Sequence, residues 1–341
     1  MLKIIDLVRH IFFIRLLNIN EENLARFTAV RFRTLNRLKD IYRSPYLIAI
    51  PERKEVSLSE CIEDAVSSLK DMAEGKKINL LWSGGIDSTL VFCALVKAGI
   101  KFTVLMDENS HKEYPFLFDK IINKEYNCDY RMFSPKGLSD LLDMVEEGDN
   151  IFVTGEIGDQ VTGSMINMRY TYEERNMMMK EVIEKDLFCQ PYTIKTVTHV
   201  YDPIPVDGIN GTQAAIAHCK DTVYEFLGSN EDNTTLAEFL WGLNFIFKYT
   251  TVLLRLHRVG LYYDGEDKNT FHFFNTEKFQ QWAMANYKEN CAYVKDTDYK
   301  MPFKDYIFEF TGDVDYRDCK LKEPSLRVCF YYDEQKSPRI Q

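Results

Sequence analysis

Short apolar runs alternate with segments of helical periodicity along the first half of the chain. A capping signature at 57–60 opens the first helical segment, and three further segments with helical spacing follow it. Four short apolar runs are typical of strands, at residues 79–82, 102–106, 128–133 and 151–153. Strands that alternate with helices predict an α/β fold with a parallel sheet covered by helices on both faces. Such sheets bind ligands beyond the carboxyl ends of their strands.

The pattern changes on both sides of this α/β region. Residues 2–17 and 21–43 have helical spacing, and helical segments dominate from about residue 170, most clearly at 235–259. Proline and glycine in residues 199–211 predict a loop that could cover a site. We therefore expect three regions: a basic helical arm or cap at 1–56, a nucleotide-binding α/β core at 57–170 and a mainly helical region at 171–341 that completes the site.

One polar stretch separates the first predicted strand from the helix that follows. Residues 83–88 read Ser-Gly-Gly-Ile-Asp-Ser. Two adjacent glycines let the backbone approach a ligand closely, and the N–H groups of the loop add to the positive end of the helix dipole, which suits phosphate. The sequence lacks the Gly-Lys-Ser/Thr ending of a Walker loop and the G-x-G-x-x-G dinucleotide fingerprint. A plain strand-to-helix turn is the alternative, because these are common turn residues.

This stretch resembles the S-G-G-x-D-S signature of the PP-loop ATP pyrophosphatases, which adenylate a substrate and release pyrophosphate. A second loop, which follows the predicted strand at 151–153, contains Gly155, Glu156 and Asp159. It is similar to the S/T-G-E-G-x-D-E loop in the synthetase domain of asparagine synthetases. Ile157 and Gln160 stand where that family has Gly and Glu.

The resemblance implies a fold of the adenine nucleotide alpha hydrolase (HUP) type with a mainly helical extension, and ATP and Mg²⁺ as ligands. It implies that backbone groups of Leu81, Val104 and Gly155 contact adenine and ribose. The residues that it assigns to the phosphates belong to the first loop: Ser83, Gly84, Gly85, Asp87 and Ser88. Asp87 and Asp159 would hold Mg²⁺, directly or through water. Asp87 could instead be an ordinary acid at a helix start, and Asp159 a turn former.

The resemblance extends to the C-terminal part of the chain. Residues 302–307 and 316–325 are similar to the family's T-K-x-x-L-R helix and R-x-K-E loop. In amide-forming members, a lysine of that loop pairs with the glutamate of the second loop and stabilises the acyl-adenylate transition state. Glu156 matches the glutamate, and either Lys322 or Lys320 matches the lysine. Both lysines could also be ordinary residues of an exposed loop.

These expectations describe a ligase that forms AMP and pyrophosphate, adenylates a carboxylate or an amide, and passes it to an amine. Both substrates would be small molecules. A glutaminase domain with an N-terminal Cys is not expected, because the chain opens with Met1-Leu2 and a basic segment. A PP-loop enzyme that modifies a nucleobase in tRNA or DNA is a second interpretation. A nucleotide-binding module without catalysis is a third, suggested by Ile157 and Gln160.

Charge limits the partners. The formal net charge of -10 argues against general adhesion to nucleic acid. Residues 1–56 contain 11 Lys/Arg and 6 Asp/Glu, a net charge of +5 that leaves -15 for the remainder. This basic segment could contact a nucleic acid or an acidic partner, or could dock on the acidic body of the same chain.

Cysteine usage and hydropathy indicate the compartment. The 8 cysteines include no C-x-x-C pair, so zinc is not expected, and Cys93 falls in an apolar helical pattern where a thiol behaves as a small hydrophobe. The apolar N-terminus, residues 1–19, is interrupted by charged side chains and is too short for a membrane span. We expect a cytoplasmic protein without a membrane segment.

Overall fold

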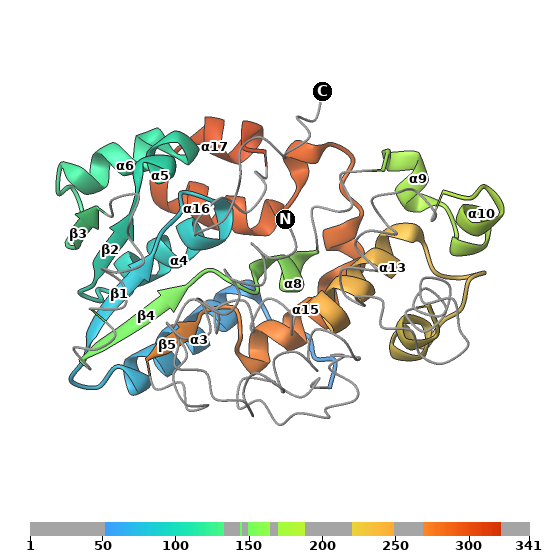
Figure 1. Ribbon diagram of the computed structural model, residues 1–341, viewed down its shortest axis with the longest axis horizontal. Coiled ribbons are helices and arrows are strands. Elements are labelled where there is room, and N and C mark those ends of the chain that lie inside the picture. The colour runs from blue at the N-terminus through green and yellow to red at the C-terminus, as the bar shows by residue number, and fades with distance from the viewer. Residues whose placement is uncertain are drawn as a thin grey trace, which may run out of the picture. The chain divides into compact units, whose positions relative to one another are not determined.

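The computed structural model describes residues 52–132, 144, 149–163, 170–187, 220–248 and 269–321 (Figure 1). The chain forms two compact units, and each combines separate parts of the sequence. The sheet unit comprises Ser57–Glu156, Lys268–Thr276 and Lys295–Gln341. The helical unit comprises Met1–Val56, Ile157–Asp267 and Glu277–Val294. Almost all of the expected arm lies outside the described residues, and the domain boundaries at 57 and 171 stay predictions.

Five parallel strands form the sheet of the sheet unit, in the order β3-β2-β1-β4-β5 (Figure 1). The strands are β1 Lys77–Leu81, β2 Thr103–Met106, β3 Asp129–Met132, β4 Asn150–Thr154 and β5 Thr270–His272. The expected parallel α/β sheet is therefore confirmed, and the ends of the four predicted strands lie within two residues of the observed ends. β5 was not expected as a strand. The HUP-type assignment stays a prediction.

The central strand carries the first loop. β1 pairs with β2 on one side and with β4 on the other, so that Leu81 lies between Leu105 and Thr154. Because all three strands run in the same direction, the segments that follow their carboxyl ends share one edge of the sheet. This is the edge at which open α/β sheets bind ligands.

Helices lie around the sheet. α3 (Leu58–Met72) begins with the predicted capping box, in which the N–H of Ser57 donates to Glu60 at 2.7 Å and the N–H of Glu60 donates to the Ser57 hydroxyl at 3.2 Å. α4 (Ile86–Lys97) is apolar on nearly all sides and packs against α16. The other helices of this unit are α5 (Glu108–Glu113), α6 (Pro115–Ile122), η3 (Asp296–Asp298), α16 (Met301–Thr311) and α17 (Val314–Cys319).

The helical unit has its own core. Its named helices are α8 (Gly158–Thr162), α9 (Tyr172–Asn176), α10 (Met179–Glu184), α13 (Leu236–Leu243), the π-helix η2 (Asn244–Lys248) and α15 (Glu277–Cys291). Val182, Val223 and Leu240 are fully buried in one apolar cluster. The helix expected at 235–259 is present as α13 and continues into η2 as far as Lys248. Residues 249–259 of that helix lie outside the described part, as do the loop at 199–211 and nearly all of the helix expected at 138–146.

Two further expectations concern burial and membranes. Cys93 lies inside α4 with no exposed surface, and burial raises the pKa of its thiol well above the ordinary value, so the side chain is an inert apolar group. Among the described residues, no helix has both the length and the apolar character needed to cross a membrane.

Candidate active site

The predicted loop stands where the sequence indicated, between the end of β1 at Leu81 and the start of α4 at Ile86. The N–H of Trp82 still donates to the carbonyl of Leu105, at 2.9 Å, so the loop leaves the sheet at residue 83. The Ser83 N–H donates to the Ser88 hydroxyl at 3.2 Å, and the two serine hydroxyls lie 3.1 Å apart. The serines therefore hold the loop in a fixed turn around its glycines.

Gly84 is required by its backbone conformation and by its neighbours. Its φ is +78°, which side-chain-bearing residues rarely adopt. A Cβ atom at this position would lie 2.6 Å from the carbonyl oxygen of Ser110 and 2.7 Å from the Cβ of Glu113. The hydroxyl of Ser110 also donates to the carbonyl of Trp82 at 2.9 Å. The end of α5 is thus packed directly against the first loop.

Gly155 brings the second loop to the first. A Cβ atom on Gly155 would lie 2.7 Å from the backbone nitrogen of Ser88, so only glycine fits this contact between the end of β4 and the start of α4. The N–H of Glu156 donates to the Thr154 hydroxyl at 3.3 Å, and that hydroxyl lies 2.7 Å from Nδ1 of His272 in β5. His272 was not singled out in the sequence, and in the structure it anchors the strand end from which Glu156 starts.

Leu81 and Val104 were predicted to contact the nucleotide through their backbones. Leu81 is the last residue of β1, at the carboxyl edge of the sheet. Val104 is fully buried within β2, two residues before the carboxyl end of that strand. Their predicted role is therefore restricted to main-chain groups, and it stays a prediction.

The carboxylate of Asp87 is paired with a lysine that the sequence analysis missed. Lys300 Nζ donates to Asp87 Oδ1, and 0% of the lysine side chain and 14% of the aspartate side chain are exposed. Lys300 has a φ of 59° at the start of α16, which turns the chain into the helix next to α4. Lys300, Phe303 and Lys304 have the K-x-x-L-R spacing, with Phe and Lys at the last two positions, so a match begun two residues earlier would have found this lysine.

Lys320, one of the two predicted catalytic lysines, lies beside the first loop. Its Nζ donates to the carboxylate of Glu113 and, at 2.9 Å, to the Glu113 main-chain carbonyl. Glu156, the expected partner, forms no hydrogen bond or ion pair with Lys320 in the described part of the chain. Lys322 lies outside the described residues. Glu113 is a second residue that the sequence did not indicate.

A third lysine, Lys304, holds the backbone of Lys320. Lys304 in α16 is fully buried, and its Nζ donates to the carbonyl of Thr297 at 2.5 Å and to the carbonyl of Lys320 at 2.6 Å. Burial lowers the pKa of Lys304 to about 8. The amine fixes the backbone of Lys320 from inside the unit.

Asp159 lies in the helical unit, in the first turn of α8, whereas Asp87 lies in the sheet unit. Asn244 of η2 donates to the carbonyl of Asp159 at 2.5 Å and accepts from the Gln160 amide at 3.2 Å. Gln160 is 1% exposed, so the position where the family has Glu is a buried amide with an amide partner. Ile157 has a φ of 75°, the conformation that the family's glycine adopts freely.

The two ligands expected from the sequence differ in how well these residues fit them. The first loop suits a nucleotide phosphate, because the contacts between Ser83 and Ser88 preform its turn at the start of α4. For Mg²⁺, the described residues contain no group of three or more His, Cys, Asp or Glu side chains arranged to hold a metal. Since Mg²⁺ usually keeps several waters and takes one or two carboxylates with phosphate oxygens, Asp87 fits as a single protein ligand.

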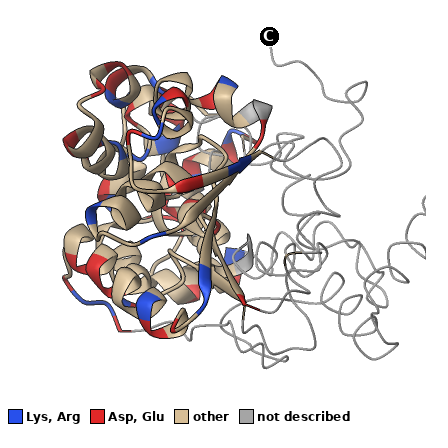
Figure 2. Ribbon diagram, turned by 90° about the vertical axis from the view of Figure 1, so that its left-hand side faces the viewer, with Lys and Arg blue, Asp and Glu red and all other residues tan. Residues whose placement is uncertain are grey.

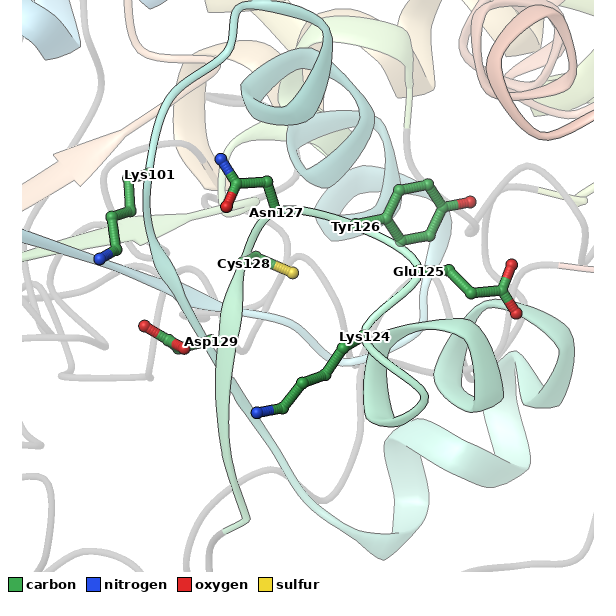
Figure 3. A pocket seen from close by; sticks show the side chains of 7 residues that line it. All are labelled: Lys101, Lys124, Glu125, Tyr126, Asn127, Cys128 and Asp129. Carbon is green, nitrogen blue, oxygen red and sulfur yellow. The ribbon is translucent and has the colours of Figure 1, made fainter.

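A pocket of about 440 Å³ lies elsewhere in the sheet unit, between the start of β2 and the start of β3 (Figure 3). Its lining residues are Lys101, Lys124, Glu125, Tyr126, Asn127, Cys128 and Asp129. These residues stand at the amino ends of the strands, whereas the first loop follows a carboxyl end. The pocket contains none of the predicted site residues.

Charge is mixed over the described elements, and segments of both signs alternate along the coloured helices and strands in Figure 2. The basic excess of the sequence belongs to residues 1–56, nearly all of which lie outside the described part.

No protein-family model matches this chain, and no curated protein matches it.

Proposed function

We propose that this protein is an ATP-dependent ligase that splits ATP into AMP and pyrophosphate, adenylates a carboxylate or amide, and transfers the acyl group to an amine. One observation carries the proposal: Lys300 and Lys320, from the C-terminal part of the chain, both lie at the Ser83–Ser88 loop. Lys300 binds Asp87 within that loop, and Lys320 binds Glu113, whose Cβ lies close to Gly84.

The chemistry of cleavage between the α and β phosphates explains why such a grouping is useful. Pyrophosphate leaves with several negative charges, so the site needs donors and cations at the place where that charge develops. The loop offers backbone N–H groups at the start of α4, and the two lysines offer positive charge from another part of the unit. Mg²⁺, when bound, would supply further positive charge at the phosphate oxygens.

Glu156 and Lys320 would handle the amine and the acyl group. Glu156 follows Gly155, which lies just beyond the end of β4 and packs against Ser88, so the backbone of Glu156 starts at the first loop. Lys320 is held at the same loop by Glu113. The proposal assigns Lys320 to the developing negative charge and Glu156 to the proton of the attacking amine, with Lys322 as the alternative lysine.

The test measures the release of AMP and pyrophosphate from ATP, with Mg²⁺ and pooled carboxylic acids present. Hydroxylamine serves as a general amine that accepts the acyl group. Mass spectrometry then identifies any hydroxamate and hence the acyl donor. Ser83→Ala removes a hydroxyl that holds the loop, and Ser59→Ala on the exposed face of α3 is the matched control. The ligase proposal fails if no pool of acids gives more AMP with the wild-type protein than with the Ser83→Ala variant.

The pairing of Asp87 with Lys300 also favours a second candidate, a module that binds nucleotide without cleaving it. In that case the lysine would take the place of a metal ion at Asp87. Binding of ATP in calorimetry without any AMP formation would support this candidate. Stimulation of AMP formation by RNA or a nucleotide would instead indicate nucleobase modification, through the basic segment at 1–56.

A further inference from the structure

We propose that Glu113 is a positioning residue, which holds the amine of Lys320 at the Ser83–Ser88 loop. This inference rests on the proposed function, since it names the carboxylate through which the catalytic lysine of that same site is placed. Glu113 takes the part that the sequence had suggested for Glu156.

In the described part of the chain, both hydrogen bonds of the Lys320 amine go to one residue of α5, Glu113. Its Nζ donates both to the carboxylate of Glu113 and to the Glu113 carbonyl, so two acceptors of one residue fix the amine. The pair is largely shielded from water, with 13% of the lysine side chain and 8% of the glutamate side chain exposed. A shielded pair with two hydrogen bonds keeps its geometry better than an exposed ion pair does.

Glu113 is itself fixed against the first loop. Its Cβ lies so close to Gly84 that a Cβ atom added to this glycine would be only 2.7 Å away. α5 and the first loop are therefore in close contact here. The next residue, Tyr114, stacks on Tyr316 of α17 with ring centroids 3.9 Å apart, and the Tyr316 hydroxyl donates to the Gly84 carbonyl at 3.4 Å. α5 and α17 thus meet at Gly84.

The backbone of Lys320 is fixed from the other side. The buried amine of Lys304 donates to the Lys320 carbonyl at 2.6 Å, just beyond the end of α17. The backbone of Lys320 is therefore held by Lys304, and its side-chain amine by Glu113. A lysine on a flexible stem normally loses much rotational freedom when it binds, and these two contacts remove that freedom in advance.

The test compares Glu113→Gln, Glu113→Asp and Lys320→Met with the control Glu125→Gln, whose carboxylate forms an exposed pair with Lys120 in the same unit. Each variant is measured for AMP formation, for the KM of ATP and for thermal unfolding. Acetylation of Lys320 by acetic anhydride, without nucleotide, is followed by mass spectrometry, with Lys180, whose exposed pair with Asp232 no variant changes, as the internal reference.

Glu113→Gln is expected to lower kcat about tenfold or more with little change in the KM for ATP, because the amine is misplaced. Glu113→Asp should recover part of kcat, and Lys320→Met combined with Glu113→Gln should be no slower than Lys320→Met alone. Lys320 should acetylate faster in Glu113→Gln, since its side chain is released, and Glu125→Gln should leave Lys320 unchanged.

Unchanged acetylation of Lys320 in Glu113→Gln would overturn the inference, and so would an unchanged kcat in an active protein. A lower KM for ATP at unchanged kcat would also overturn it, because Glu113 would then compete with phosphate. If the wild-type protein forms no AMP, the ligase proposal fails, but the acetylation of Lys320 still decides whether Glu113 holds this lysine.

Discussion

Lys300 and Asp87 form an ion pair across 213 residues of sequence, and the lysine side chain is completely buried. The pair joins the start of α16 to the start of α4, which pack side by side. It also fixes the acid that would hold Mg²⁺. A metal at Asp87 would therefore share this carboxylate with Lys300 or displace the lysine amine.

Removal of either member of this pair should destabilise the protein strongly. Lys300→Met leaves Asp87 shielded beside an apolar side chain, and Asp87→Asn leaves the buried ammonium of Lys300 beside a neutral amide. Each change is expected to lower the free energy of unfolding by about 2–4 kcal/mol, less than for a fully buried pair because Asp87 is partly exposed. Urea denaturation monitored by tryptophan fluorescence measures both.

The double variant separates pairing from other effects. Asp87→Asn combined with Lys300→Met should cost about 1–3 kcal/mol less than the sum of the single changes, because both members of the pair are then neutral. Strict additivity of the two costs would contradict the pairing. Leu321, exposed near the end of the described chain, offers a control through Leu321→Ala, which should stay within about 0.5 kcal/mol of wild type.

The sequence predicted the strand, the loop and the helix around Gly84 because each depends on local pattern. An apolar run, two glycines and an apolar helix lie within one short segment. The capping box of Ser57 and Glu60 is equally local, three residues apart. β5 escaped prediction because three residues are too short to show a strand pattern, and its contact with Thr154 spans 118 residues.

The parts of the site that escaped prediction depend on distant contacts. Glu113 and Lys320 are 207 residues apart, and nothing in the sequence next to Glu113 marks it as different from other surface acids. Lys300 lies two residues before the segment 302–307 that resembles the family's helix, and only the contact with Asp87 shows that its amine reaches the loop. Local pattern identifies the loop, and tertiary contact identifies the charges around it.

Gly84 and Gly75 allow strain and crowding to be measured separately. Both have positive φ, 78° and 75°, but a Cβ on Gly75 would meet nothing within 4 Å. Gly75→Ala should therefore cost about 1 kcal/mol through backbone strain alone. Gly84→Ala should cost about 2–4 kcal/mol, because overlap with Ser110 and Glu113 adds to the same strain. Urea denaturation compares the two, and equal costs would mean that the loop yields to a side chain.

The burial of Gln160, in the second loop, leads to a prediction about the stability of its variants. Its amide donates to Asn244, its Oε1 has no hydrogen-bond partner within the described residues, and it is 1% exposed. Gln160→Glu introduces the residue that the family resembled by this loop has, but buries a carboxylate, which should lower the free energy of unfolding by about 2–4 kcal/mol. Gln160→Met should cost about 1 kcal/mol or less, since it also removes an acceptor without a partner.

Thermal or urea unfolding of these two variants measures the difference. If Gln160→Glu is as stable as wild type, a cation must be available to the carboxylate. The hydrogen bond between Gln160 and Asn244 would then not be needed for stability. Asn244→Ala should loosen α8 through the loss of its bond to the Asp159 carbonyl.

Lys304 should give the protein an unusual dependence of stability on pH. Its pKa is lowered from 10.5 to about 8 in the folded state by burial, so between about pH 8 and 10.5 the unfolded state binds the proton and the folded state does not. Because stability rises with pH wherever the unfolded state binds more protons, the cost of burying this ammonium is full below pH 8 and is relieved above it.

Urea denaturation of wild type and Lys304→Met at pH 7 and pH 9.5 isolates the effect, since the contributions of the other lysines cancel in the difference. The wild type should gain about 1–2 kcal/mol relative to the variant over this interval. A constant difference between the two proteins would mean that the amine keeps its proton, held by the carbonyls of Thr297 and Lys320.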